Sequence, residues 1–455
     1  MKNGKRSSFS GKLGYVLAAA GASVGLGNIW RFPYLAAKYG GGIFLIIYIV
    51  LALTFGYTMI VAETAIGRMT RKSPVGAFKS FGKKKWLSFG GWINAVIPVL
   101  IVPYYSVIGG WVIKYLVEYF RGNAKLLAED GYFTDFISNG VSTELCFVAF
   151  CAFTLIIIFA GVQNGIERVS KIMMPILIVL SVIIAVYSVT RPGALAGVKY
   201  FLVPNVKNFS WMTVVSAMGQ MFYSLSIAMG ILITFGSYMK KDTAIEDSTR
   251  NVEIFDTGIA IMAGLMIIPA VFAFSGGDPD TLQAGPSLMF ITIPKVFQNM
   301  GFGTVIGIVF FLLVLFAAVT SSIALTESAV STFEDELGWG RKKATVLVGV
   351  IMLVLGSLSS LGYGPLAGIK IIGMQFLDLF DFLTNSVMMP IAAFLTSLLV
   401  SKVVGIDKIE EEIVHGESAF RRKKVFVVMI KYLCPVFAII ILLSSVANAL
   451  GWIKM

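Results

Sequence analysis

Charged residues are scarce in this chain of 455 residues: Asp, Glu, Lys and Arg make up 14% of it, against about 25% in an average soluble domain. Hydrophobic residues make up 57%. So little charge excludes a soluble globular protein. The alternation expected of a membrane β-barrel is also missing, because the apolar runs continue for about twenty residues, the length of a membrane-spanning helix.

Histidine and cysteine are nearly absent as well. The single histidine, His415, stands in a charged loop without metal-ligand companions, and Cys146, Cys151 and Cys434 all fall inside apolar runs. This pattern argues against an extracellular disulfide framework and predicts that the cysteines serve packing. The sequence shows no motif that pairs a nucleophilic side chain with a general base, so we expect no enzymatic activity and no organic cofactor.

The apolar runs predict an all-α polytopic membrane protein with about eleven transmembrane helices. A small-residue cleavage site is missing after the basic N-terminus, which indicates a first span rather than a signal peptide. The expected spans are residues 13–37, 41–69, 88–118, 144–161, 168–189, 212–238, 252–274, 303–333, 343–361, 371–400 and 425–450.

The net charge of the chain is +12, and the positions of its basic residues indicate how the chain is oriented in the membrane. Most Lys and Arg residues fall in alternate short loops rather than on one face, which predicts a cytoplasmic N-terminus, an external C-terminus and no nucleic-acid partner. We therefore expect a multi-pass protein of the cell (inner or plasma) membrane, in contact with the lipid bilayer. The long external segment after the seventh span, residues 275–300, predicts a helical hairpin that acts as a lid.

Two predicted spans carry interruptions. Gly21, Gly25 and Gly27 lie within seven residues of the first span, and the sixth span contains YSLSIAMG at residues 223–230. Glycine costs about 1 kcal/mol in a helix interior, so unwinding is one interpretation, and close helix packing is the other. Breaks in spans one and six would begin two five-helix repeats of opposite orientation, which favours a central ligand site.

Such a site would suit a zwitterion and small hard cations, because helix N-termini favour a carboxylate and freed carbonyls favour cations. Arg31 and Asp381 are candidates for an ion pair on the external side. Glu63 is expected to hydrogen-bond unwound backbone, and Asp256 is a candidate cation ligand. Glu327 receives no predicted role.

Six motifs resemble, in order, the neurotransmitter:sodium symporter family: KLGYVLAAAGASVGLGNIWRFPYLAAKYGGGIF, GQMFYSLSIAMG, GPSLMFITIPKVF, AAVTSSIALTE, TFEDELGW and FLDLFDF. The resemblance runs from about Leu13 to the tenth or eleventh span and is strongest to bacterial amino-acid transporters with the leucine-transporter fold. It implies a 5+5 inverted repeat. The expected parts are a cytoplasmic gate segment (1–12), a core of two repeats (13–400, split as about 13–190 and 212–400), a cytoplasmic loop (401–424) and a peripheral eleventh helix (425–455).

The resemblance also implies two sodium sites. One would use the carbonyls of Gly21, Val24 and Ala317 with the hydroxyls of Thr320 and Ser321. The other would use the Ser23 carbonyl, Asn28, Ser224 and Asp256, completed by the substrate carboxylate.

For the substrate, the resemblance implies an α-amino acid held at the two breaks. Its carboxylate would meet the amides of Leu26 and Gly27 and the Tyr105 hydroxyl, and its amine would meet carbonyls of Ser23, Tyr223 and Ser224 and the Ser226 hydroxyl. The side chain would be surrounded by Ile101, Ile108, Tyr223, Met229, Ser321 and Leu325. Gly25 stands where monoamine carriers of the family have an aspartate, which favours an amino acid over a lone amine.

Two gates are implied in the same way. Arg31 and Asp381, above Tyr105 and Tyr223, resemble the outer gate. Arg6 with Asp335 resembles the inner gate; its supporting residues would be Phe9, Ser237 and Tyr238. In span five, Gly165 and Pro175 match a spacing that the family links to helix unwinding and sodium release.

Departures from the family pattern sharpen these expectations. Phe9 replaces the usual tryptophan of the inner gate, while Tyr223 and Met229 replace phenylalanines, and methionine gives an adaptable pocket wall. Asp256 replaces the asparagine of chloride-dependent relatives, and Ala260 their chloride-binding serine. A fixed carboxylate would supply the charge that chloride brings, so we expect chloride independence.

These observations predict a sodium-coupled importer of neutral, hydrophobic or aromatic L-amino acids that works by alternating access. Two alternatives stay open at this point. One is a proton-coupled transporter of the same fold, with Asp256 or Glu327 titrating; the other is a non-transporting amino-acid receptor or a channel.

Overall fold

The computed structural model describes residues 6–276, 285–449 and 451–452, and nearly all of them lie in helices. Nine continuous helices in this described part are long and apolar enough to cross a membrane. They span Gly42–Thr70 (α3, η2 and α4), Lys85–Phe120 (α6), Gly140–Phe159 (α9), Val162–Val189 (η3 and α10), Ile245–Ser275 (α14), Gly303–Leu337 (α16), Arg341–Leu361 (α17), Phe376–Val404 (α18, η7, α19 and η8) and Lys423–Ala449 (α21, η9 and α22).

Two further crossings are broken. The first consists of α1 (Lys12–Ser23), followed by η1 (Gly27–Arg31) and α2 (Phe32–Lys38), with a bend of 52°. The other consists of α12 (Trp211–Ser224) and α13 (Ile231–Tyr238), separated by six residues. The bent pair raises the candidate crossings in the described part to ten, and α12 with α13 occupies the place of the predicted sixth span, which agrees with about eleven crossings. Both breaks fall at the predicted positions.

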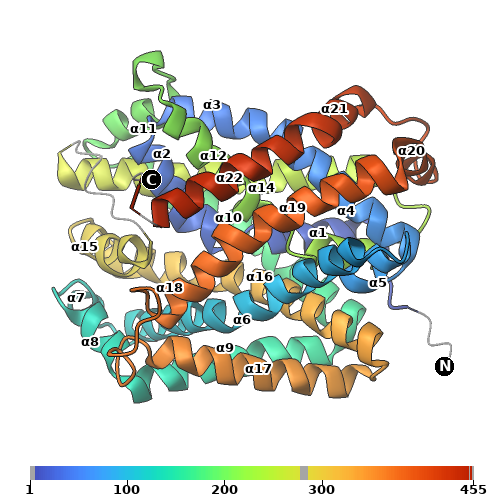
Figure 1. The fold of residues 1–455 in the computed structure, drawn as a ribbon. Coiled ribbons are helices and arrows are strands. Elements are labelled where there is room, and N and C mark those ends of the chain that lie inside the picture. The colour runs from blue at the N-terminus through green and yellow to red at the C-terminus, as the bar shows by residue number, and fades with distance from the viewer. Residues whose placement is uncertain (1–5, 277–284, 450, 453–455) are drawn as a thin grey trace.

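Short helices occupy the two ends of the bundle. Figure 1 shows α7 (Ala124–Leu127), α8 (Tyr132–Ser138) and α15 (Ile293–Gln298) at one end, and α5 (Pro74–Lys79) and α20 (Ile406–Val414) at the other. The long helices run between these ends (Figure 1). α11 (Ala194–Leu202) packs against α14.

The hairpin predicted after α14 lies only partly within the described residues. Its described residues form one helical stretch, in which η6 (Leu288–Thr292) continues into α15. Residues 277–284 lie outside the described part. Leu288, Met289, Phe290 and Ile293 are all buried, so the described apolar stretch packs onto the bundle.

The broken crossings are held in the middle of the bundle. α13 packs against α4, and α16 packs against α6, while α1 contacts α14, α16 and α10. Gly236 and Gly67 lie at the α4–α13 contact, where an added Cβ would lie 2.5 Å from the Thr64 carbonyl oxygen and 2.0 Å from that of Ile233. Glycine at these positions lets the two backbones touch, which fixes α13 against α4.

Candidate functional site

The two helix breaks face each other and are joined by hydrogen bonds. The Ser226 hydroxyl donates to the Ala22 carbonyl at 3.0 Å, and the Gln220 amide donates to the Gly27 carbonyl at 3.0 Å. Ser226 has a positive φ of 53°, a conformation that L-residues rarely adopt. Unwound backbone from both repeats therefore meets in the buried interior.

The loop between α12 and α13 is supported by Glu63 of α4. Its Oε1 accepts a hydrogen bond of 2.8 Å from the backbone amide of Ala228, a second residue with positive φ. Glu63 is fully buried. The expectation that Glu63 bonds unwound backbone is confirmed.

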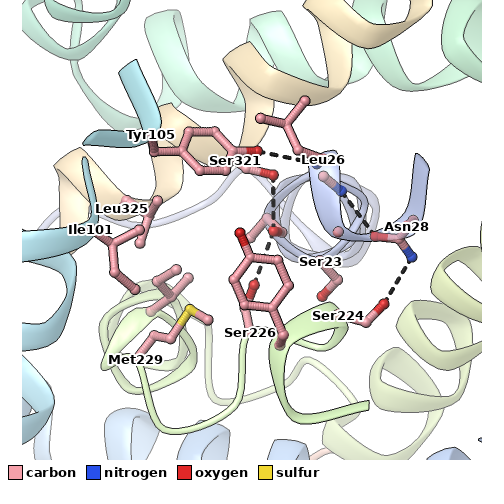
Figure 2. A pocket seen from close by; sticks show the side chains of 15 residues that line it. Ser23, Leu26, Asn28, Ile101, Tyr105, Ser224, Ser226, Met229, Ser321 and Leu325 are labelled. Carbon is pink, nitrogen blue, oxygen red and sulfur yellow. Dashed lines mark hydrogen bonds between the residues drawn. The ribbon is translucent and has the colours of Figure 1, made fainter. Parts of the chain in front are cut away.

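A small cavity lies at the junction of the breaks (Figure 2). It is lined by Ala22, Ser23, Gly25, Leu26, Gly27, Asn28, Ile101, Tyr105, Tyr223, Ser224, Ser226, Met229, Ile231, Ser321 and Leu325. Eleven of the twelve residues predicted to bind substrate are in this set. The exception is Ile108, which is buried but does not line the cavity. Its α6 position is one turn beyond Tyr105, which places it farther along the helix.

Polar groups occupy one side of the cavity and apolar side chains the other. The Leu26 amide donates to the Tyr105 hydroxyl at 3.3 Å, at the start of the helix that follows the first break. Figure 2 shows Ile101, Met229 and Leu325 together, away from Asn28 and Ser224. The cavity volume is about 30 Å³, enough for one or two water molecules, so any larger ligand requires these side chains to move apart.

A hydroxyl and carboxylate cluster lies next to the cavity. Asp256 of α14 is fully buried and accepts hydrogen bonds from the Asn28 amide at 2.8 Å and from the Ser224 hydroxyl at 2.8 Å. The Tyr48 hydroxyl donates to the other Asp256 oxygen at 2.7 Å. Tyr48 was not among the predicted residues, because one tyrosine in an apolar run carries no signal that separates it from core packing.

A second group of oxygens lies between α1 and α16. The Ser321 hydroxyl is 3.3 Å from the Gly21 carbonyl oxygen and 3.5 Å from that of Val24. Thr320 donates to the Ala317 carbonyl of its own helix at 3.2 Å, and a Cβ at Gly21 would lie 3.1 Å from the Thr320 Cβ. All five residues of this predicted site are thus brought together.

Each group consists of hard oxygen donors. Within the described residues no three His, Cys, Asp or Glu side chains form a cluster that could hold a metal ion. Carbonyl and hydroxyl oxygens with at most one carboxylate suit a monovalent hard cation better than a transition metal. In the Asp256 group, Asn28 directs its amide nitrogen toward the carboxylate, so its amide would have to turn to present oxygen to a cation.

The outer charged pair is not in direct contact, which corrects the predicted ion pair. The guanidinium of Arg31 lies over the Tyr223 ring, 5.4 Å from its centroid. Asp381 instead accepts hydrogen bonds from Tyr104 at 3.1 Å and Asn385 at 2.6 Å. Both neutral donors bond Oδ1 of the carboxylate, while the guanidinium packs on the aromatic ring.

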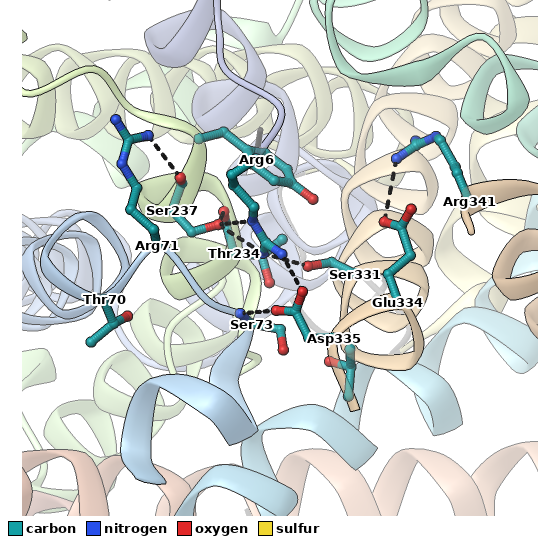
Figure 3. Close-up of polar contacts among 12 residues, drawn as sticks. Arg6, Thr70, Arg71, Ser73, Thr234, Ser237, Ser331, Glu334, Asp335 and Arg341 are labelled. Carbon is teal, nitrogen blue, oxygen red and sulfur yellow. Dashed lines mark hydrogen bonds and ion pairs between the residues drawn. The ribbon is translucent and has the colours of Figure 1, made fainter. Parts of the chain in front are cut away.

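The inner charged pair is formed (Figure 3). Arg6 lies 2.6 Å from Asp335, and it also donates to Ser331 at 2.8 Å and to Ser237 at 2.9 Å. Asp335 accepts the backbone amide of Ser73 at 2.6 Å. The chain before α1 is therefore fastened to α13, α16 and the start of α5.

Two further features strengthen this inner end. Arg341 donates from both terminal nitrogens to Glu327, at 3.0 and 2.6 Å, and the Tyr238 hydroxyl donates to the same carboxylate at 2.7 Å. Phe9 is buried, with its ring edge-on to Tyr15, Phe235 and Tyr238. Glu327 thus joins Arg341 and Tyr238 at this end, a role that was not predicted from the sequence.

The predicted span-five motif lies at the same end. Gly165 belongs to η3 (Val162–Glu167). Its Cα packs closely against the Ile157 carbonyl oxygen, since an added Cβ would lie 2.1 Å from that oxygen. Pro175 lies within α10 (Arg168–Val189). Glu167 accepts hydrogen bonds from the Ser10 amide and hydroxyl, which ties this turn to the segment before α1.

Comparison with known proteins agrees with this architecture. The model of the sodium:neurotransmitter symporter family matches residues 6–127 and 134–452. An uncharacterised sodium-dependent transporter of Bacillus subtilis is 34% identical over 450 residues, covering 98% of this chain and 99% of the relative. The human sodium- and chloride-dependent GABA transporter 2 is 26% identical, over 90% of this chain and 75% of the relative.

A solved structure is similar over nearly the whole chain. It is the crystal structure of MhsT in complex with L-phenylalanine, which is 34% identical to this chain, with a TM-score of 0.86 and coverage of 97% of this chain and 100% of MhsT. The family match extends across both repeats and both breaks. The chain therefore belongs to the sodium:neurotransmitter symporter family.

Proposed function

We propose that this transporter imports neutral L-amino acids with hydrophobic or aromatic side chains together with sodium. The observation that carries the proposal is the meeting of two unwound helices beside a buried carboxylate cluster, with an apolar pocket wall opposite. Transport requires binding and release alone, so no covalent step is assigned to any residue. The crystal structure of MhsT with L-phenylalanine supports an aromatic amino acid as the kind of substrate.

The substrate backbone would span the two breaks. The amides of Leu26 and Gly27, at a helix N-terminus, and the Tyr105 hydroxyl suit a carboxylate. The carbonyls of Ser23, Tyr223 and Ser224 and the Ser226 hydroxyl suit the amine. Gly25 leaves no carboxylate for a lone amine, and a Cβ there would lie 2.6 Å from the Ser321 hydroxyl oxygen.

The side chain would occupy the apolar wall formed by Ile101, Met229 and Leu325. This wall must open, since the cavity is only about 30 Å³. Met229 lies in the loop between α12 and α13, and its unbranched side chain can change rotamer at low cost. Aromatic and large aliphatic side chains would therefore be accepted according to how far Met229 turns.

Two sodium ions would be cotransported substrates in this scheme. One would bind among Gly21, Val24, Ala317, Thr320 and Ser321, and the other among Ser23, Asn28, Ser224, Asp256 and the substrate carboxylate. Because the second ion and the amino acid would share ligands, each raises the affinity of the other. This reciprocal coupling is what a sodium gradient needs in order to drive uptake.

We further propose that transport is independent of chloride. The Asp256 carboxylate lies among Tyr48, Ser224 and Asn28, and it would provide a negative charge belonging to the protein next to the second ion. Ala260, one turn further along α14, offers no hydroxyl for an anion. The family resemblance places both departures at the positions that serve chloride in other members.

Alternating access would use the two charged pairs as gates. In this scheme the joined Arg6 and Asp335 would form a closed inner gate, and the separated Arg31 and Asp381 would form an open outer gate. The inner end carries the basic loops, so we assign it to the cytoplasm, with the N-terminus inside and the C-terminus outside. We keep the predicted division of the chain into a gate segment (1–12), a core of two repeats (13–400), a loop (401–424) and a peripheral helix (425–455).

Uptake into proteoliposomes tests the proposal. Purified protein is reconstituted, and a panel of radiolabelled L-amino acids is offered with an inward sodium gradient or with potassium in its place. Concentrative uptake of hydrophobic or aromatic amino acids in sodium alone is the expected result. Uptake driven equally by a proton gradient without sodium would overturn the coupling, and saturable binding without accumulation would overturn transport.

A further inference from the structure

Arg68 is a fully buried cation for which the proposed transport cycle has no use. It lies in the last turn of α4 (Tyr57–Thr70), and its side chain is 0% exposed. Its Nε donates to the Glu412 carboxylate of α20 at 2.7 Å. An isolated buried charge is costly, so such a cation is retained only where acceptors are arranged around it. The acceptors around Arg68 therefore show which segments it holds together.

The other donors of Arg68 bind main-chain oxygens of two segments. Nη1 donates to the carbonyl of Lys241 at 3.3 Å and to that of Thr243, both in the connection between α13 and α14. Nη2 donates to the carbonyl of Glu412 itself. A guanidinium presents five N–H donors in one plane, which suits several acceptors held at fixed positions. Arg68 thus joins α4, the α13–α14 connection and α20 at one point.

The loop that contains α20 is also bound to α14, by reciprocal bonds. The Glu417 side chain accepts hydrogen bonds from the backbone amides of Glu246 and Asp247, in the first turn of α14. The Glu246 side chain in turn accepts the amides of Arg421 and Arg422 at 2.8 Å each, just before α21 (Lys423–Val428). Amides at helix starts lack partners within their own helix, so each carboxylate satisfies donors of the other segment.

The α13–α14 connection directly follows residues of the predicted inner gate. The Phe9 amide donates to the Tyr238 carbonyl at 3.0 Å. From the other side, Arg71 at the end of α4 donates to the Ser237 carbonyl at 3.0 Å (Figure 3). The last turn of α13 is therefore held between the segment before α1 and the end of α4, where Arg68 lies.

We propose that Arg68 and Glu412 are positioning residues of the inner gate, and that the loop 401–424 takes part in keeping the gate closed. By fastening this loop to the α13–α14 connection, they keep Ser237 and Tyr238 where the segment before α1 can bind them. Loosening the loop should therefore let the inner side open more often. The proposal rests on the inner gate of the proposed transport function and adds to it a loop whose composition indicates only a linker.

Accessibility of the inner path tests this in the reconstituted full chain. Ser328→Cys provides the reporter, because Ser328 is buried and hydrogen-bonded to Thr234 of α13. A membrane-impermeant thiol reagent is applied from the inner face. Adding Glu412→Gln keeps the shape of the side chain but removes the charge that Arg68 faces, and it should raise the labelling rate at least fivefold. Glu411→Gln, at the preceding and exposed residue of α20, should leave the rate unchanged.

A second variant loosens the loop without removing the partner of Arg68. Glu417→Gln weakens the bonds to the first turn of α14 and should raise the labelling rate at least threefold, and it decides the matter if Glu412→Gln does not fold. Native Cys151, buried on α9, reports a general loosening of the fold, and its labelling should not change.

An unchanged labelling rate at Ser328→Cys in every loop variant that folds would overturn the proposal. An equal rise at Cys151, or an equal rise in Glu411→Gln, would also overturn it. The labelling needs neither sodium nor an amino acid, so its result stands even if sodium-driven uptake is not observed.

Discussion

Asn28 and Asp256, which are 228 residues apart in the chain, are joined by a hydrogen bond of 2.8 Å in the buried interior. Asn28 lies just after the first helix break, and Asp256 belongs to the second repeat. Tyr48 and Ser224 bond the same carboxylate. The Asp256 carboxylate thus bonds residues of the first, second and sixth crossings at the position proposed for a cation.

Asp256 should make chloride dispensable. Wild-type uptake is expected to be unchanged when gluconate replaces chloride. Asp256→Asn removes the fixed charge, so uptake should fall at least tenfold without chloride, and adding Ala260→Ser should restore part of it when chloride is present. The control is Asp407→Asn on α20, an exposed carboxylate whose loss should change nothing. Wild-type uptake that needs chloride would contradict the account.

Gly25 should be needed for substrate binding because of its hydrogen side chain. An added Cβ would lie 2.6 Å from the Ser321 hydroxyl oxygen and 3.0 Å from that of Tyr105. Gly25→Ala is expected to abolish saturable amino-acid binding while the protein still folds. Gly258→Ala is the matched control, since nothing lies within 4 Å of a Cβ there. Binding that survives in Gly25→Ala would place the substrate elsewhere.

Met229 should set the size of the accepted side chain. Met229→Phe places a larger and stiffer side chain in the pocket wall, which leaves less room for a large substrate side chain. The ratio of tryptophan uptake to leucine uptake should therefore fall roughly tenfold, in line with about 1–3 kcal/mol for a changed apolar contact. Competition assays against labelled leucine measure the ratio. Ile156→Phe, at a side chain that is 66% exposed on α9, should leave it unchanged. An unchanged ratio in Met229→Phe would remove this residue from the pocket.

The Arg6–Asp335 pair should hold the inner gate closed. Both side chains are partly exposed, so the pair contributes about 1 kcal/mol, and Arg6→Ala should raise the inward-open population roughly fivefold. Labelling of a cysteine at Ser328 by a membrane-impermeant reagent added from the inner face measures this. The companion variant Lys125→Ala, on α7 at the opposite end, should label at the wild-type rate. Equal labelling rates in Arg6→Ala and Lys125→Ala would show that the Arg6–Asp335 pair does not hold the inner gate closed.

Glu327 and Arg341 should behave as a unit in stability. Glu327 is fully buried, so removing Arg341 leaves a buried carboxylate without its cation, at about 3–5 kcal/mol, whereas Arg341 is 21% exposed and also lies 3.9 Å from Glu334. Arg341→Gln should therefore lower the thermal unfolding temperature more than Glu327→Gln does, and the double variant should be more stable than Arg341→Gln alone. Strictly additive losses would show that the two side chains do not depend on each other.

Much of this architecture is readable from the sequence because each feature has a local cause. Gly21, Gly25 and Gly27 weaken one helix, and the polar run around Ser226 interrupts another, so both breaks were predicted within a few residues. Family resemblance then assigned the residues around them. The structure brings these residues together, while their roles in binding stay predictions.

The remaining features depend on distant neighbours. Arg31 and Asp381 were expected to pair, but Tyr223, Tyr104 and Asn385 offer other partners that only the fold brings near. The role of Glu327 follows from Arg341, fourteen residues later on a different helix. Tyr48 cannot be told from an ordinary core tyrosine until its hydrogen bond to Asp256 on the facing helix is known.

Uptake of labelled L-phenylalanine and L-leucine by proteoliposomes under an inward sodium gradient tests sodium coupling directly. Both amino acids should accumulate above the external concentration, and this accumulation should collapse when sodium is equal on both sides or is replaced by potassium. Accumulation that persists without a sodium gradient would contradict it.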